Sequence, residues 1–139
     1  MKIEIIKHTI KTTATPAQIW AVWQEVERWV SWDHNIELCE LDGPFQSGTT
    51  GRLKMRNSPL FQIVTTSVEP YKMFIQETKL FLAKNISKHF ITQLDGTTLV
   101  TFQNEMHGPL ALFYTFLIGS SIRKKIPVEM EEMLKKVKI

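Results

Sequence analysis

Single polar side chains interrupt several apolar strand-like segments, and they are the residues most able to do chemistry. Gln76 and Asn104 each alternate with large apolar residues, so both would lie on apolar faces of a sheet. A buried amide costs free energy unless it is hydrogen-bonded, and a ligand or a trapped water could supply the missing partner. Alternatively, these positions lie near strand ends and are exposed to water. The sequence leaves both interpretations open.

No arrangement of residues in the sequence indicates a catalytic or metal centre. Asp33 and His34 could form an acid/base pair, but adjacent side chains do not normally face each other. Ser120 and Ser121 lack the sequence pattern of a nucleophile elbow. Paired metal-ligand spacing is missing among the four histidines, which are His8, His34, His89 and His107. We therefore predict no catalytic residues, no metal and no cofactor.

Aromatic residues are concentrated near the N-terminus, where four tryptophans lie within thirteen positions: Trp20, Trp23, Trp29 and Trp32. Large aromatic rings usually fill cores, so the simplest interpretation is that they pack short helices against a sheet. Trp32 is the exception that we expect at a cavity mouth, because it lies where the helices give way to a strand.

Composition indicates one ordinary globular domain spanning residues 1–139. The chain is 43% hydrophobic and 22% charged, with a net charge of +3. Cys39 is the only cysteine, which excludes an internal disulfide and favours a reducing compartment. The most apolar run, 109–119, is too short to span a bilayer, which needs about 20 residues. We predict a cytoplasmic protein, monomeric or homodimeric, without a transmembrane segment or a DNA partner.

Periodicity predicts one strand, two short helices, six further strands and a long final helix. Residues 2–12 alternate, and Thr15, Pro16 and Gln18 form a helix-start signal. The strands expected next cover 36–41, 49–56, 61–68, 72–80, 84–94 and 97–107. Asp95-Gly96 is the strongest hairpin signal among them. Consecutive strands joined by short turns predict an antiparallel sheet.

Residues 109–139 have the spacing of one long amphipathic helix, with a possible bend at Pro127. Its predicted buried stripe recurs every three or four residues and comprises Leu112, Phe116, Gly119, Ile122, Ile126, Met130, Met133 and Val137. Bulky residues at its start and small ones at 119–121 would leave room between helix and sheet. We therefore predict an α+β fold in which a seven-stranded curved sheet wraps around this helix.

Several ordered segments are similar to a known superfamily. Residues 15–20 (TPAQIW), 26–32 (VERWVSW), 43–49 (GPFQSGT), 63–70, 95–101 and 108–111 resemble, in order, motifs of the START-related, birch-allergen-like helix-grip superfamily (SRPBCC). The resemblance is strongest to its bacterial polyketide cyclase/dehydrase-like branch. Thr97 departs from the pattern by replacing the second glycine of a Gly-Gly-Thr turn. These motifs hold turns and core positions, so they specify the fold more than the function.

The resemblance implies a cavity between sheet and final helix that binds an apolar small molecule, such as a lipid, a polyketide-like compound or an isoprenoid. The residues expected to bind this ligand are Trp32, Leu53, Met55, Phe74, Gln76, Phe90, Phe102, Asn104, Met106, Phe113, Phe116 and Leu117. One alternative is a polyketide cyclase or dehydratase, in which Asn104, Gln76 and His34 would steer proton transfer. Another is a protein- or ribosome-interaction module that uses the basic run Arg123–Lys125.

Overall fold

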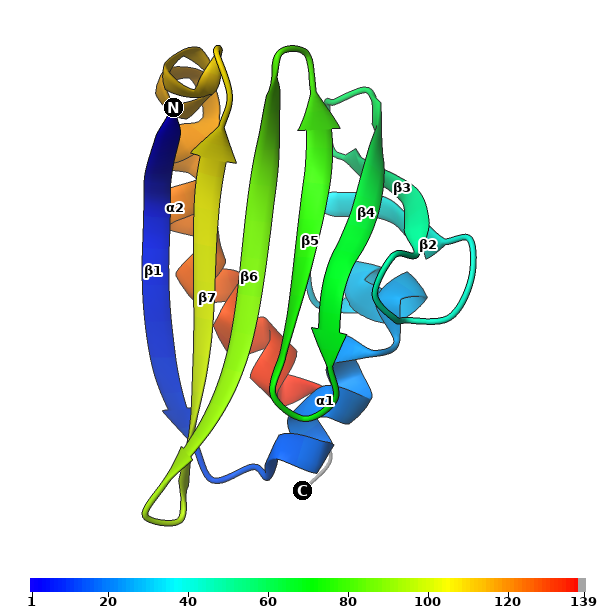
Figure 1. Ribbon diagram of the computed structural model, residues 1–139. Coiled ribbons are helices and arrows are strands. Elements are labelled where there is room, and N and C mark those ends of the chain that lie inside the picture. Colours follow the sequence, from blue (N-terminus) through cyan, green and yellow to red (C-terminus); the bar gives the residue numbers. More distant parts are fainter. Residues whose placement is uncertain (138–139) are drawn as a thin grey trace.

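The computed structural model describes residues 1–137 as one sheet, two short helices and a long helix. Its elements are β1 (Lys2–Thr12), α1 (Pro16–Trp23), η1 (Val26–Ser31), β2 (Ile36–Leu41), β3 (Thr50–Met55), β4 (Leu60–Glu69), β5 (Met73–Leu80), β6 (Ala83–Leu94), β7 (Thr97–His107) and α2 (Ala111–Lys135). The seven strands are antiparallel, in the order β1-β7-β6-β5-β4-β3-β2. Figure 1 shows α2 crossing one face of this curved sheet, with α1 at its lower end. The predicted fold class is confirmed.

Two local structures form as the sequence predicted, the cap of α1 and the β6–β7 hairpin turn. The Thr15 side chain accepts a hydrogen bond from the Gln18 backbone amide, and the Gln18 side chain accepts one from the Thr15 amide, at 3.2 and 2.8 Å. This capping box satisfies amides that have no partner within α1. At the β6–β7 turn, Asp95 and Gly96 both have positive φ, 50° and 77°, as a tight hairpin requires.

The helices differ from the sequence prediction in detail. The second short helix is a 3-10 helix, η1, and α2 is shorter than the predicted 109–139. Residues 138–139 of that prediction lie outside the described residues. Pro127 lies inside α2, which continues beyond it. Between residues 1 and 137, no helix combines the length and the apolar character needed to cross a bilayer.

An aromatic cluster fills the core between α1, η1 and the sheet. Phe74 of β5 is 1% exposed and lies at its centre. The ring centroids of Trp23, Phe45 and Trp29 lie 5.1, 5.1 and 5.7 Å from that of Phe74. The indole of Trp29 donates a hydrogen bond to the Trp23 carbonyl at 3.0 Å, so its polar atom is satisfied. The interpretation of the tryptophans as core residues therefore holds for this cluster.

The buried stripe predicted for α2 is only partly correct. Gly119, Met130 and Met133 are buried, but Leu112 and Phe116 are exposed. The start of α2 instead turns Ala111, Tyr114 and Ile118 toward a small second core with Ile5 and Met106. A three-and-four repeat identifies an apolar face, but both sides of this first half are apolar, so periodicity alone could not choose between them.

Removing the α1 cap should lower the stability of the protein. We expect Thr15→Ala to reduce the free energy of unfolding by about 1 kcal/mol, because the Gln18 amide loses its acceptor. Urea unfolding followed by circular dichroism would measure the change. Thr13→Ala is the matched control, since Thr13 is exposed and makes no side-chain hydrogen bond within residues 1–137. Equal effects of both substitutions would contradict the capping role.

Candidate functional site

A cavity of about 600 Å³ lies between α2 and the middle of the sheet. Its walls are largely apolar and come from α1, η1, β2 to β7 and α2. The large apolar side chains of the wall include Trp23, Trp29, Trp32, Leu53, Phe61, Phe74, Phe102, Leu117, Ile118, Ile122, Ile126 and Met130. This volume lies within the range of small-molecule pockets, about 300–1,000 Å³.

Most of the residues predicted to bind a ligand lie in this wall. The structure brings together Trp32, Leu53, Met55, Phe74, Gln76, Phe102, Asn104 and Leu117. Alternation along the strands accounts for the pairs Phe74–Gln76 and Phe102–Asn104, since neighbours two apart share a face. Whether these residues bind a ligand stays a prediction.

Four predicted residues lie outside the wall. Phe90 is on the opposite face of β6, because its neighbour His89 pairs with Phe102 and faces the cavity. Met106 is fully buried in the second core beside Ala111, beyond the cavity. The remaining two, Phe113 and Phe116, are 56% and 89% exposed because α2 turns them outward. Placing these four in the cavity wall was wrong.

The amides in the wall already have partners within the protein. Asn104 and Asn85 exchange two side-chain hydrogen bonds at 2.8 and 2.9 Å, and Asn104 also donates to Ser87 at 3.2 Å. Gln76 donates to Thr65 at 3.2 Å. These bonds lower the cost of burying the amides. The amides are buried, so the alternative that they are exposed to water is wrong, and the ligand or water considered as their partner is not required. Their free lone pairs can still accept hydrogen bonds.

His89 is a cavity residue that the sequence reasoning did not select. Its ring stacks on Phe74 with centroids 4.0 Å apart and packs edge-on against Phe102 at 4.7 Å. Burial lowers the pKa of His89 to about 3, so the imidazole is neutral at physiological pH. Its Nδ1 atom is buried without a hydrogen-bond partner among the described residues. The only sequence signal was its alternation with Ser87 and Ile91 on β6.

A pair of carboxyl groups lies at another part of the wall. Burial, together with the charge of Asp33, raises the pKa of Glu129 to about 7. Burial also raises the pKa of Asp33. Asn35 ties the pair together, because its side-chain amide donates to Glu129 Oε1 and its backbone amide donates to Asp33 Oδ1, both at 3.0 Å. Glu129 Oε2 has no described partner. A carboxyl with such a pKa can give or take a proton near neutral pH.

Sequence reasoning missed this pair because its members are distant in the chain. Asp33 had been considered only with its neighbour His34. The structure leaves His34 exposed and outside the cavity wall. Glu129 lies in a run of charged residues, where its sequence context resembles that of the exposed Glu131 and the half-buried Glu132. Within residues 1–137, no cluster of three His, Cys, Asp or Glu side chains has the geometry for a metal ion.

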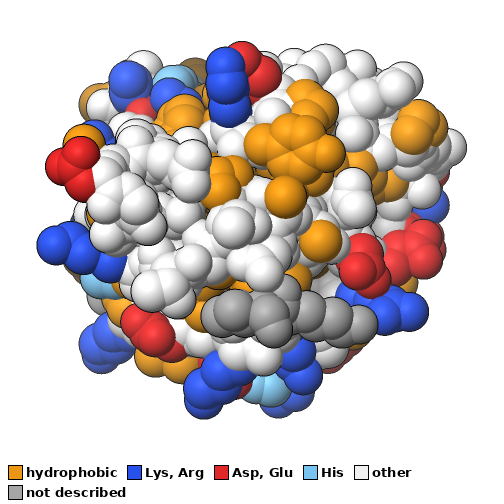
Figure 2. Space-filling view, turned by 90° about the horizontal axis from the view of Figure 1, so that it is seen from below, with side chains coloured by type: hydrophobic (Ala, Val, Ile, Leu, Met, Phe, Trp, Pro, Cys, Tyr) orange, Lys and Arg blue, Asp and Glu red, His pale blue; other side chains and the backbone are white. Residues whose placement is uncertain are grey.

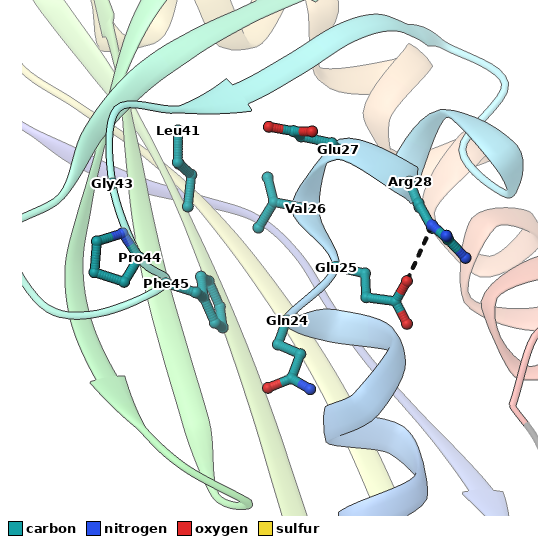
Figure 3. Close-up of a pocket in the computed structure, with 9 residues that line it drawn as sticks. All are labelled: Gln24, Glu25, Val26, Glu27, Arg28, Leu41, Gly43, Pro44 and Phe45. Carbon is teal, nitrogen blue, oxygen red and sulfur yellow. Dashed lines mark ion pairs between the residues drawn. The ribbon is translucent and has the colours of Figure 1, made fainter.

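A second hollow, of about 380 Å³, lies between the α1–η1 connection and the loop after β2. Figure 3 shows Phe45 and Val26 facing each other across it, and Glu25 paired with Arg28 at 3.1 Å. This ion pair is solvent-exposed and contributes little energy. None of the lining side chains has a buried polar atom without a partner. We therefore place the candidate site in the larger cavity.

Solved structures with the same architecture include proteins of several kinds. An aromatase/cyclase, Zhui, from a Streptomyces species has a TM-score of 0.76 at 11% identity and covers 98% of this chain and 93% of its own. Truncated norcoclaurine synthase from Thalictrum flavum has a TM-score of 0.72 at 12% identity and covers 97% of this chain and 92% of its own. Ara h 8.0201 has a TM-score of 0.71 at 11% identity and covers 98% of this chain and 100% of its own.

No protein-family model matches the chain, and no curated protein matches its sequence. The structural similarity therefore establishes the fold alone. It is the helix-grip fold that the sequence resemblance predicted. Function has to be argued from the site.

The carboxyl pair should make stability depend on pH. The folded-state pKa of Glu129 is about 7, against an ordinary value of 4.5, so the folded state holds more protons between these pH values. Stability should therefore fall as pH rises through this window. We expect Glu129→Gln to raise the free energy of unfolding at pH 8 by about 1 kcal/mol, with little effect at pH 4.

Urea unfolding at several pH values would test this expectation. Glutamine keeps the oxygen that accepts from Asn35, so the substitution removes mainly the charge. The control is Glu131→Gln on the same helix, which is exposed and has no described ion pair. A pH profile that Glu129→Gln leaves unchanged would show that the pair does not carry the pH dependence.

Proposed function

We propose that this protein binds an apolar small molecule, such as a lipid, a polyketide-like compound or an isoprenoid, in the cavity under α2. The observation that carries the proposal is the cavity itself, because close-packed interiors seldom leave a space of about 600 Å³ empty. Its walls are mostly apolar, so transfer of an apolar ligand from water would be favourable by about 25 cal/mol per Å² buried.

The positions of the polar groups support a ligand with one polar end. The amides of β5 and β7 are held by internal hydrogen bonds, and His89 is neutral. The charged side chains of the wall are Asp33, Glu129, Arg56 in the turn after β3 and Lys125 of α2. A carbonyl or hydroxyl of the ligand placed near Glu129 would find a hydrogen-bond donor whenever that carboxyl is protonated.

Two neighbouring serines of α2 allow a direct test. Ser121 lines the cavity, whereas Ser120 points to solvent. Fluorescence of the cavity tryptophans would be titrated with fatty acids, isoprenoid alcohols and aromatic polyketides. We expect Ser121→Phe to weaken binding by about tenfold or more, because the ring would occupy ligand space, and Ser120→Phe to leave it unchanged. Equal affinities of both variants would place binding elsewhere.

Catalysis is the second candidate, and the Asp33–Glu129 pair favours it. A polyketide cyclase or dehydratase needs a group that exchanges protons inside an apolar cavity, and Glu129 is suited to this by its pKa of about 7. His34, considered in the sequence analysis, is outside the wall. Arg123, from the basic run considered for a protein or ribosome contact, donates to the Ile5 carbonyl at 2.9 Å and is thus engaged within the fold.

Incubation with a synthetic poly-β-keto thioester, followed by mass spectrometry of the products, would test the catalytic candidate. We expect the wild-type protein to accelerate loss of water from the chain and Glu129→Gln to lose most of this effect, about a hundredfold. Glu131→Gln should retain it. Binding of the same chain without any acceleration would leave the protein as a carrier.

A further inference from the structure

A large apolar surface lies beside the cavity, at the end of the molecule where β5 meets β6 and α2 begins. We define this apolar end by six exposed side chains: Phe81, Leu82, Leu112, Phe113, Phe116 and Leu117. Phe81 is 74% exposed and Phe116 is 89% exposed, which is unusual for phenylalanine. Contiguous exposed apolar surface marks an interaction site in most folded proteins.

The two parts of the apolar end are joined by hydrogen bonds. The Leu110 amide donates to the Leu82 carbonyl at 3.1 Å, and the Tyr114 hydroxyl donates to the Phe81 carbonyl at 3.1 Å. In Figure 1 the β5–β6 turn and the start of α2 lie together at the top. Leu82 has a positive φ of 54°, so this turn presents two large apolar residues on a tight bend.

The cavity reaches this same surface. Leu80 and Tyr114, which line the cavity, are direct sequence neighbours of Phe81 and Phe113. Leu117 belongs to both features, since it lines the cavity and is 62% exposed. A partner covering the apolar end would therefore lie next to a route into the cavity.

Basic side chains surround the apolar end. Lys79 and Lys84 face each other across the β5–β6 hairpin, one residue below the tip on each strand. Both are exposed. Among residues 1–137, Lys84 has an ion pair, with Glu77 at 2.9 Å, and Lys79 has none. Arg56, in the turn after β3, is also exposed. An apolar tip between cations is suited to the surface of an anionic bilayer. The aromatic rings of the protein would enter the acyl region, and its cationic side chains would contact the lipid phosphates.

The opposite end of the molecule differs. Figure 2 views it from below and shows acidic side chains among the lysines and histidines around its rim. Apolar side chains are exposed there as well, but Leu94, at the base of the β6–β7 turn, is followed by Asp95 rather than by a lysine. The combination of an exposed apolar tip and flanking lysines belongs to the end that carries Phe81 and Phe116.

We propose that the apolar end docks on the surface of a membrane containing anionic lipids and there opens the cavity toward the bilayer. The docking stands on the exposed surface and its basic flanks. Only the further idea that the cargo enters from the bilayer rests on the proposed ligand binding. A second copy of this chain fits less well, because a two-fold contact between these ends would bring Lys79 and Lys84 of both copies together.

Flotation of the protein with lipid vesicles tests the docking. We expect binding to vesicles of phosphatidylcholine with phosphatidylglycerol and weaker binding to phosphatidylcholine alone. The double substitution Phe81→Ser, Phe116→Ser should weaken partitioning by about a hundredfold or more. Lys79→Gln should weaken binding to the anionic vesicles by about fivefold. Leu94→Ser is the matched control at the opposite end and should leave binding unchanged.

Three results would overturn the proposal. The first is that the protein floats with neither kind of vesicle. The second is that Leu94→Ser weakens vesicle binding as much as the double substitution does. The third is that the protein binds no vesicle but forms a dimer in analytical ultracentrifugation, which the double substitution dissociates. Phe81 and Phe116 are outside the cavity wall, so the double variant should still bind cavity ligands in the tryptophan titration. Binding to vesicles without binding of any cavity ligand would refute the proposed function alone. Binding of a cavity ligand without binding to vesicles would refute the docking alone.

Discussion

The cavity exists because α2 is held along one side of the sheet instead of over its centre. The helix packs on β1 and β7, which form one edge of the sheet, and does not pack closely on β4, β5 and β6. Arg123 fixes this position by donating to the Ile5 carbonyl of β1 at 2.9 Å. At the other end, Met130 and Met133 pack into the aromatic core. With both halves anchored, collapse onto the sheet centre would break both contacts.

The chemistry of the cavity follows from how its polar groups are satisfied. Amides and hydroxyls on β4 to β7 bond to one another, so most of the wall behaves as an apolar surface. His89 is neutral for the same reason, since nothing in its apolar surroundings stabilises a charge. The carboxyl groups of the wall lie together where Asp33 and Glu129 meet, and the other charged wall residues are Arg56 and Lys125. A long ligand would therefore find an apolar channel with one end able to exchange protons.

The sequence predicted the architecture well because short-range rules decide it. Alternation marked the strands, and the Thr15 cap and the Asp95-Gly96 turn marked their boundaries. The same alternation placed Phe74, Gln76, Phe102 and Asn104 together in the wall. It failed for Phe90, because both faces of β6 mix polar and apolar residues and period two does not say which face is concave.

The remaining errors have the same origin in long-range packing. Phe113 and Phe116 have the residue type of core positions. Which face of the first two turns of α2 is buried depends, however, on contacts with β1 and β7. The pairing of Asp33 with Glu129 depends on where the helix crosses η1 and β2. Neither relation leaves a local pattern in the chain, so residue type alone suggested core phenylalanines and did not indicate a buried glutamate.

Native mass spectrometry tests the central claim, that the cavity holds an apolar small molecule, most directly. The protein would be measured as purified and after incubation with a total lipid extract, beside the Ser121→Phe variant. The account predicts a complex of one protein with one small molecule that separates under denaturing conditions and is depleted in the variant. Detection of the bare protein mass alone in both samples, with wild type and variant alike, would contradict it.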